Sequence, residues 1–337
     1  MTTAAAALPQ RGRGAQFRRG VQPYLYLVPA FSVMAIITFY PLIFQVWMSF
    51  HEFGQINFRV RNPVPPDFIG LENYVRIAQS KLAIPNFEFI RLVLFNLWWA
   101  FSNVVVHVVL GVLVAVVLNT KGVRFRGIYR ALFILPVVIP QIIVATVWRN
   151  MFDPDAGAIN YGLQAAGGLF GIAADNPAFH LNWLRQPNDP ISWLPLPLAY
   201  FAMITANTWL GWPLNSVVAT GALQSIPGEL YEAAEMDGAS PWQKFRNVTI
   251  PFLRPAMLPY AIYGFVITFN LFFLPFFMTQ GEPFGRTEIL VTQAYRLAFE
   301  RRLFGVAAAF AVYLFFLLLI VTLITNRMAK ATKSYAE

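Results

Sequence analysis

The feature that most constrains this chain is a series of six long windows that contain no Asp, Glu, Lys or Arg. They cover residues 20–51, 92–120, 131–148, 190–228, 256–281 and 303–326. Each window can hold about 20 apolar residues, roughly the number that an α-helix needs to cross a hydrocarbon core of about 30 Å. The sequence therefore predicts an all-α polytopic membrane protein with six transmembrane helices.

The composition argues against other classes of protein. Hydrophobic residues make up 57% of the chain and charged residues 12%, whereas a soluble domain carries about 25% charged residues. The net charge of +9 would also suit a nucleic-acid-binding protein. The basic residues stand beside the apolar windows, however, so we expect no nucleic-acid partner. The absence of cysteine excludes disulfides and cysteine-based metal or catalytic sites. The first window lacks a small-residue cleavage site and predicts a retained span.

The third window is the shortest and carries Pro136 and Pro140. Proline kinks a helix, and a membrane helix tolerates the kink where neighbouring helices satisfy the freed carbonyl groups. We expect a full span here, and a re-entrant or buried core segment is the alternative.

Basic residues predict the orientation. They precede the first window, fill the connection 121–130 without any acidic residue, and follow the last window: Arg11, Arg13, Arg18, Arg19, Lys121, Arg124, Arg126, Arg130, Arg327, Lys330 and Lys333. By the positive-inside rule, both termini and the connections 121–130 and 222–254 face the cytoplasm, while 52–91 and 149–189 face outward. We expect residues 1–19 to be a disordered cytoplasmic terminus, 20–330 the membrane domain, and 331–337 a cytoplasmic tail.

The segment 227–255 is a polar, charged island between two apolar windows. Pro227 suits the first turn of a helix. Glu229, Glu232 and Glu235 follow it near the helix N-terminus, where carboxylates interact favourably with the helix dipole. Gly238 allows the left-handed residue that ends a helix, and Ser240 and the proline after it begin a second one. The segment predicts a short helix–turn–helix on the cytoplasmic face. An amphipathic helix that only anchors the protein to the membrane surface is the alternative.

The same segment carries Glu-Ala-Ala, two residues, Asp-Gly-Ala, and then Phe, Ile and Pro at set distances. The matching residues are Glu232, Ala233, Ala234, Asp237, Gly238, Ala239, Phe245, Ile250, Pro251 and Pro255. This pattern resembles the EAA loop of bacterial ABC importer permeases. The resemblance implies a coupling helix that docks on a separate ATPase. It gives this role to Glu232, Ala233, Ala234, Asp237, Gly238 and Ala239, and above all to Glu232 and Gly238.

Other segments resemble the carbohydrate branch of these permeases, the maltose-permease-like type, over roughly residues 20–330. They are Tyr40-Pro41, residues 68–74, Phe125-Arg126, the group Pro136, Pro140, Trp148 and Phe152, residues 223–227, and the group Thr279, Gly281, Pro283, Thr287, Tyr295 and Phe299. In the last group Gln280 and Glu282 stand where the branch carries glycines. This departure predicts a stiffer outer loop or a different contact with a partner.

The resemblance implies the permease subunit of an ATP-driven importer in the bacterial cytoplasmic (inner) membrane. Its partners would be membrane lipid, a second permease subunit, an ATPase dimer and an extracytoplasmic solute-binding protein that delivers a sugar or oligosaccharide. ATP and Mg²⁺ would bind to the ATPase, so this chain would hold no cofactor and would not be an enzyme. The same machinery for another polar solute, such as glycerol phosphate, is an alternative.

A substrate path is predicted from polar residues inside the fourth and fifth windows, because such groups are costly unless they face an interior or a cavity. Neutral hydrogen-bonding side chains and aromatic faces suit a sugar. The predicted path residues are Asn207, Leu210, Gly211, Tyr263, Gly264, Thr268, Asn270 and Leu271. Helix packing is an equally good explanation for the Asn and Gly residues. His107, in the second window, is interpreted as a packing residue rather than a proton carrier.

Absent motifs exclude further functions. The chain has no Gly-rich loop ending in Gly-Lys-Ser/Thr, so it does not bind ATP through a P-loop. No carboxylate lies inside a window, so a secondary transporter, the alternative from another class, would lack its usual coupling group. No cluster of side chains typical of a membrane-embedded enzyme is present.

Overall fold

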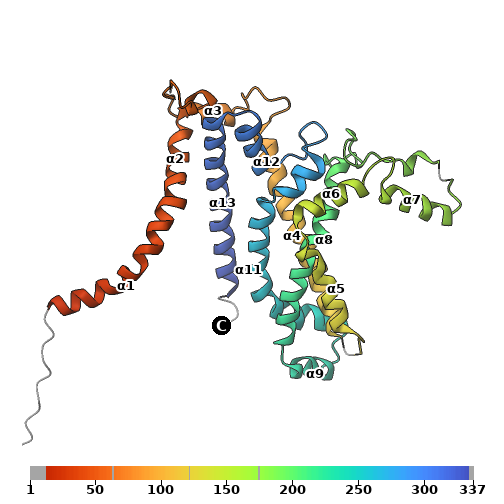
Figure 1. Cartoon of the computed structure of the whole chain (residues 1–337). Coiled ribbons are helices and arrows are strands. Elements are labelled where there is room, and N and C mark those ends of the chain that lie inside the picture. Colours follow the sequence, from red (N-terminus) through yellow and green to blue (C-terminus); the bar gives the residue numbers. More distant parts are fainter. Residues whose placement is uncertain (1–12, 63, 121, 174, 334–337) are drawn as a thin grey trace, which may run out of the picture.

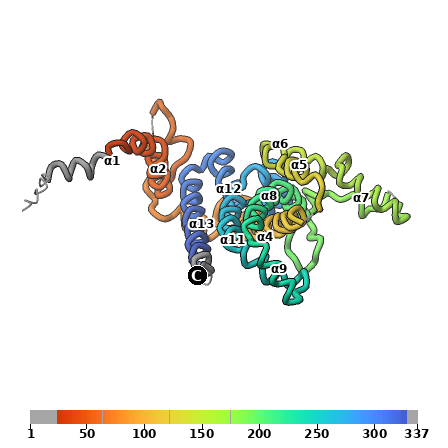
Figure 2. The backbone as a smooth tube through the Cα atoms, turned by 90° about the horizontal axis from the view of Figure 1, so that it is seen from below, coloured from red at the N-terminus to blue at the C-terminus, as the bar shows by residue number. Residues whose placement is uncertain are grey.

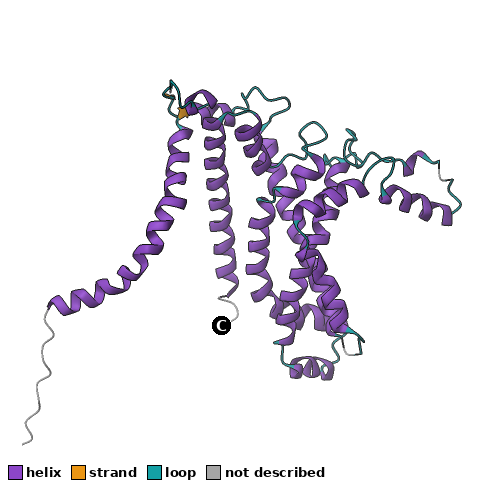
Figure 3. Cartoon of the chain, viewed as in Figure 1, coloured by secondary structure: helices purple, strands orange, loops and turns teal. Residues whose placement is uncertain are grey.

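A computed structural model describes residues 13–62, 64–120, 122–173 and 175–333. These residues form a helical molecule, and the strands found among them are a single antiparallel pair (Figure 3). The first elements are α1 (Arg13–Met34), η1 (Ala35–Phe39), α2 (Tyr40–Ser49), β1 (His51–Glu52), η2 (Gln55–Phe58), β2 (Asp67–Phe68), α3 (Glu72–Ala78) and α4 (Phe89–Asn119). They are followed by α5 (Arg126–Val138), α6 (Gln141–Met151), α7 (Ala158–Leu169), η3 (Pro177–Phe179) and α8 (Leu198–Gln224). The remaining elements are α9 (Gly228–Met236), α10 (Pro241–Lys244), η4 (Phe245–Thr249), α11 (Ile250–Phe269), η5 (Pro275–Thr279), α12 (Leu290–Tyr295), η6 (Arg296–Glu300) and α13 (Phe304–Lys333).

Long helices run side by side between two ends of the molecule (Figure 1). One end carries α9, and the other carries α3 and α12, with the strands (orange in Figure 3) beside them. In the described part of the chain four continuous helical stretches are long and apolar enough to cross a membrane: Tyr24–Ser49, Phe89–Asn119, Pro241–Phe269 and Phe304–Arg327. The predicted all-α class with membrane-spanning helices is confirmed, and the first, second, fifth and sixth predicted spans correspond to these four.

The third predicted span is not one continuous helix. Helices α5 and α6 together are apolar enough to cross, but they meet at an angle of 96°. Ile139 and Pro140 between them have extended backbone, with ψ angles of 129° and 132°. A residue that precedes proline is driven out of the α region by a clash with the proline ring. The third window thus forms a bent pair of helices, and the break lies at Pro140, where the sequence predicts a kink.

The fourth predicted span begins later than expected. Helix α8 starts at Leu198, so residues 190–197 lie outside it. It has 27 residues and no charge, which gives a length of about 40 Å at about 1.5 Å per residue. Its Asn, Thr and Gly residues lower its mean hydropathy, however, and α8 is not one of the four apolar stretches. The fifth span also shifts, because α11 begins at Ile250 and ends at Phe269, before the predicted end at residue 281.

The ends of the chain differ in part from the sequence prediction. Helix α1 begins at Arg13, so residues 13–19, predicted to be disordered, are helical. Residues 1–12 of that predicted terminus, Lys121 of the basic connection and residues 334–337 of the predicted tail lie outside the described residues.

Packing concentrates around α4 and α8, which lie next to each other in both views (Figures 1 and 2). One hydrophobic cluster joins α4, α6 and α8 around Trp99 and Met203. A second cluster joins α4 to α12 and α13 around Phe269 and Phe310. A third joins α4, α8 and α11 at the end that carries α9. By contrast, α7 projects sideways from the bundle (Figure 2).

Candidate functional site

The polar segment forms a helical hairpin whose turn is set by Gly238. This residue has a φ of +72°, a conformation that glycine adopts without steric cost. The backbone N–H of Gly238 donates to the carbonyl of Glu235 at 2.9 Å, and that of Ala239 donates to the carbonyl of Ala234 at 2.9 Å. These two bonds are the Schellman pattern that satisfies the last carbonyls of a helix. The predicted helix end at Gly238 is confirmed.

The second helix of the hairpin begins with a capping box. The Ser240 hydroxyl accepts from the backbone N–H of Gln243 at 3.3 Å, and the Gln243 side chain accepts from the backbone N–H of Ser240 at 2.7 Å. Across the turn, Lys244 pairs with Glu235 at 2.5 Å. Nine positions separate these two residues, so no local sequence pattern indicates the pair. The cap satisfies backbone groups at the start of α10, and the ion pair links α9 to α10.

The hairpin is attached to the membrane helices on both sides. The Tyr231 hydroxyl and the Thr249 hydroxyl hydrogen-bond at 2.9 Å. Tyr231 and Val248 also pack against the cluster that contains Leu223 of α8 and Leu253 of α11. A displacement of the hairpin must therefore move the ends of α8 and α11, because densely packed groups move together.

The outer face of the hairpin is open. Glu232, Ala233, Asp237 and Gly238 are exposed, and Ala234 and Ala239 are half-buried. Two large apolar side chains stand out beside them, with Met236 89% exposed and Trp242 65% exposed. Exposed large apolar groups rimmed by charge are typical of a surface that binds another protein. Neither residue is among the predicted coupling residues, although both lie within the segment 227–255.

Two of the predicted path residues on α8, Asn207 and Gly211, pack against α4. Asn207 is 4% exposed, and its side-chain N–H donates to the Asn103 amide oxygen at 2.7 Å. The Asn103 side chain in turn donates to the carbonyl of Trp99 at 2.7 Å. A Cβ atom added to Gly211 would lie 2.1 Å from the ring of His107. The structure thus gives Asn207, Gly211 and His107 packing positions between two helices, while Leu210 is half-buried beside the core.

The predicted residues on and after α11 divide into accessible and buried positions. Tyr263 is exposed, and Gly264 is half-buried with only Val104 near the place of a side chain. Asn270 is half-buried and donates its side-chain N–H to the carbonyl of Val266 at 3.0 Å. Thr268 and Leu271 are buried, and Leu271 belongs to the cluster around Trp99. The eight predicted path residues therefore include exposed, half-buried and buried positions.

The outer turn after η5 has left-handed backbone at Gln280, one of the two residues that stand where the resemblance expects glycine. Gln280 has a φ of +56° and Gly281 a φ of +84°. Thr287 donates a hydrogen bond to the Glu282 carbonyl at 2.6 Å. Arg296 holds this turn from the side, because it donates to the Gln280 carbonyl at 2.8 Å and to Glu288 at 3.2 Å. Burial raises the pKa of Glu288, and the neighbouring Arg296 charge opposes that rise.

No group of three or more His, Cys, Asp or Glu side chains in the described ranges could hold a metal ion.

Comparisons with known proteins place these features in a family. Residues 107–334, well over half of the chain, match the family described as binding-protein-dependent transport system inner membrane component. The galactooligosaccharides transport system permease protein GanP of Bacillus subtilis is 28% identical over 93% of this chain and 71% of the relative. The trehalose/maltose transport system permease protein MalF of Thermococcus litoralis is 27% identical over 94% of this chain and 96% of the relative.

The fold is similar to a solved membrane transporter. A chain in the crystal structure of a bacterial ABC transporter involved in the import of the acidic polysaccharide alginate superposes with a TM-score of 0.72 at 21% identity. The match covers 94% of this chain and 98% of that chain. The family match includes the 228–249 hairpin and the helices that hold it. The chain belongs to the family of binding-protein-dependent transport system inner membrane components, and it is a multi-pass inner-membrane permease rather than an enzyme.

Proposed function

We propose that this chain is one of two permease subunits in an ATP-driven importer of a sugar or oligosaccharide. The observation that carries the proposal is the open hairpin with Gly238 at its turn, attached to α8 and α11 within a chain of this family. The relatives named for galactooligosaccharides and for trehalose and maltose support a saccharide cargo over glycerol phosphate. An extracytoplasmic binding protein would deliver the cargo.

We propose that the end carrying α9 faces the cytoplasm. Helix α9 and the beginning of α5, where the basic connection leads in, lie at the same end of the molecule (Figure 1). Arg124, Arg126 and Arg130 lie in or next to that connection without an acidic residue. The positive-inside rule therefore supports this orientation, in which both termini are also cytoplasmic.

The hairpin would dock on an ATPase. Glu232, Asp237 and Gly238 would face the ATPase surface, with Ala233, Ala234 and Ala239 keeping the hairpin slim enough to enter a groove. Because Tyr231 and Val248 tie the hairpin to the ends of α8 and α11, closure of the ATPase dimer would shift these helices and open the path outward. ATP and Mg²⁺ would bind to the ATPase, and this chain would transmit the motion.

We propose that the substrate path follows the accessible side of α11, with Tyr263 and Gly264 on its surface and Leu210 and Asn270 beside it. The tyrosine ring suits the C–H face of a sugar, and glycine leaves room for the cargo. Asn207, Gly211, Thr268 and Leu271 would support this wall from behind, since they are packed among the helices. The second permease would supply the opposite wall.

Reconstitution tests the proposed function. The chain is assembled in vesicles with its partner permease, the ATPase and the binding protein, and uptake of labelled oligosaccharide is measured. We expect uptake only when ATP and loaded binding protein are both present. Uptake that is driven by an ion gradient without the ATPase would overturn the proposal in favour of a secondary transporter.

A pair of variants tests the path. Tyr263 and Phe315 are matched in size and are 59% and 60% exposed, but Phe315 lies on α13. We expect Tyr263→Ala to raise the KM for transport by about tenfold, because a lost contact of about 1.4 kcal/mol is a factor of ten. Phe315→Ala should leave KM unchanged. Equal kinetics in the two variants would remove α11 from the path.

A further inference from the structure

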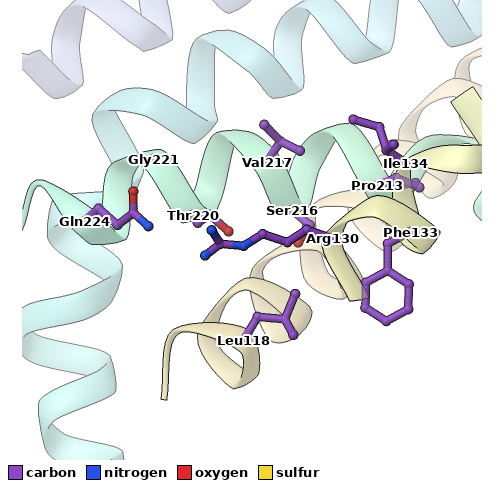
Figure 4. A pocket seen from close by; sticks show the side chains of 10 residues that line it. All are labelled: Leu118, Arg130, Phe133, Ile134, Pro213, Ser216, Val217, Thr220, Gly221 and Gln224. Atoms are coloured by element: carbon purple, nitrogen blue, oxygen red, sulfur yellow. The ribbon is translucent and has the colours of Figure 1, made fainter. Parts of the chain in front are cut away.

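A cavity of about 320 Å³ lies between the end of α4, the beginning of α5 and the second half of α8 (Figure 4). None of the predicted path residues lines it, and it is separate from the open face of the hairpin. Its volume falls within the range of about 300–1,000 Å³ that small-molecule sites occupy. The cavity therefore has the size of a binding site with no function assigned to it so far.

One wall of the cavity is a polar ladder on α8. Ser216, Thr220 and Gln224 are spaced four residues apart and share one face of the helix. Within the described residues their side chains make no hydrogen bond, whereas Thr205 on the same helix donates to the carbonyl of Phe201 at 2.8 Å. Two hydroxyl groups and one amide are thus free to bind a ligand in the cavity.

Arg130 adds a positive charge to this wall. Its side chain extends from α5 along α8, and in the view of Figure 4 its guanidinium group ends beside Thr220. No ion pair is formed by Arg130 in the described part of the chain, and the connection 121–130 contains no acidic residue. An unpaired guanidinium beside hydroxyl donors is a suitable partner for a phosphate group.

The rest of the cavity is apolar and continues onto an exposed apolar surface. Phe133, Ile134 and Val217 line it. Val217 is also exposed, as are Leu132 and Leu135 on the neighbouring part of α5. A ligand that fits both parts has an anionic head and hydrocarbon chains.

We propose that this cavity binds the headgroup of an anionic phospholipid from the cytoplasmic leaflet. The phosphate lies between Arg130 and the Ser216–Thr220–Gln224 ladder, and the acyl chains follow the apolar surface of α5 and α8. Basic pockets between transmembrane helices on the cytoplasmic side are known lipid headgroup sites. The assignment of the leaflet rests on the orientation given under the proposed function. Since α8 ends at Gln224, four residues before α9, a bound lipid braces the base of the coupling hairpin.

Lipid retention by the assembled transporter tests this site. The complex, with its partner permease and ATPase, is placed in nanodiscs of phosphatidylcholine with increasing phosphatidylglycerol, and bound lipid is identified by native mass spectrometry. We compare wild type with Arg130→Gln, and with Arg124→Gln as a control, because Arg124 lies in the same connection but does not line the cavity. We expect Arg130→Gln to weaken phosphatidylglycerol retention about tenfold and Arg124→Gln to match wild type. Equal retention in all three proteins overturns the proposal.

A second pair of variants tests the cavity without changing any charge. Gly221 lines the cavity and Gly127 does not, and a Cβ atom added at either position would have no atom of another part of the chain within 4 Å. Gly221→Phe should fill the cavity and lose the lipid, while Gly127→Phe should keep it. Retention by Gly221→Phe equal to that of wild type argues against the site.

Two further measurements distinguish the lipid from other possible occupants of the cavity. Displacement of the lipid by inorganic phosphate alone would show a site for soluble anions and overturn the lipid proposal. Cross-linking from position 220 to the partner permease, instead of to a photoactivatable phospholipid, would also overturn it. Lipid retention is measured without cargo, so a failure of sugar uptake would not change the outcome of this experiment. Thiol labelling of a Ser240→Cys variant tests the orientation independently.

Discussion

At the scale of single residues, Gly238 decides the shape of the coupling hairpin. Its φ of +72° is strained for a β-branched residue, and no heavy atom lies within 4 Å of the place of a Cβ. We expect Gly238→Val to distort the turn by conformational strain alone, at a cost of about 1–2 kcal/mol. It should insert normally but lose ATPase co-purification and binding-protein-stimulated ATP hydrolysis.

Gly238→Asn is the control, since asparagine tolerates this conformation better. It should retain most of the stimulated ATP hydrolysis. Wild-type transport in Gly238→Val would mean that the hairpin is not the mechanical link, and would favour the membrane-anchor interpretation of this segment.

Asn207 is a second residue whose position we expect to affect the stability of the protein. Its hydrogen bond to Asn103 joins α8 to α4 inside the bundle. Asn207→Leu leaves the Asn103 amide oxygen buried without this donor, which costs about 1–3 kcal/mol. We expect a lower Tm of the purified protein in detergent and an unchanged KM for transport.

Thr205→Val on the same helix should have little effect on Tm, because the Thr205 hydroxyl is exposed and bonds only within its helix. An unchanged Tm together with a raised KM in Asn207→Leu would return this residue to the substrate path.

At the scale of elements, glycine governs how closely α4 and α8 approach. A Cβ on Gly211 would meet the His107 ring at 2.1 Å, whereas a Cβ on Gly221 of the same helix would meet no atom within 4 Å. We expect Gly211→Ala to destabilise the protein by about 1–3 kcal/mol through overpacking. Gly221→Ala should be neutral or slightly stabilising, because alanine is the better helix former. Thermal unfolding of the two variants checks the pair, and equal Tm values would contradict this packing.

Also at the scale of elements, we expect Glu288 in the outer turn to make the folding stability depend on pH. Burial raises the pKa of Glu288 above its ordinary value of 4.5, against the effect of Arg296. Glu288 thus binds a proton more readily in the folded chain than in the unfolded one. Folding stability should fall as the pH rises from the ordinary pKa through the raised one. Glu288→Gln should flatten this part of a Tm-against-pH profile, and an identical profile in the variant would show that other groups are responsible.

At the scale of the whole molecule, the end with α9 also holds the basic connection 121–130, and this charge predicts the orientation. Gly168 lies on the projecting α7 and Ser240 in the coupling hairpin, and the natural chain has no cysteine. Single cysteines at these positions therefore report the topology directly. We expect an impermeant thiol reagent added to intact cells to label Gly168→Cys but not Ser240→Cys. Labelling of Ser240→Cys in intact cells would reverse the orientation.

The sequence by itself determined the helical membrane class, four of the spans and the position of the hairpin turn. These features depend on local chemistry. A charge-free apolar window of about 20 residues is long enough for a helix to cross the hydrocarbon core, and a glycine that follows a helical segment is the usual residue for a left-handed turn. Ser240 and Gly238 take the roles that the sequence predicts because both roles depend on neighbouring backbone groups.

The tertiary structure alone decided which polar residues face a neighbour and which face a cavity. Asn207 and Ser216 lie on one helix and are both uncharged, yet Asn207 meets Asn103 on α4 and Ser216 lines the cavity with Arg130. Their partners are far away in the sequence, so helical spacing selects a face without indicating what covers it. Likewise, Pro140 predicts a kink, but only the structure shows that α5 and α6 meet at 96°, with α5 against α8 and α6 against η5. Long-range packing is thus what separates a supporting residue from one that can bind a ligand.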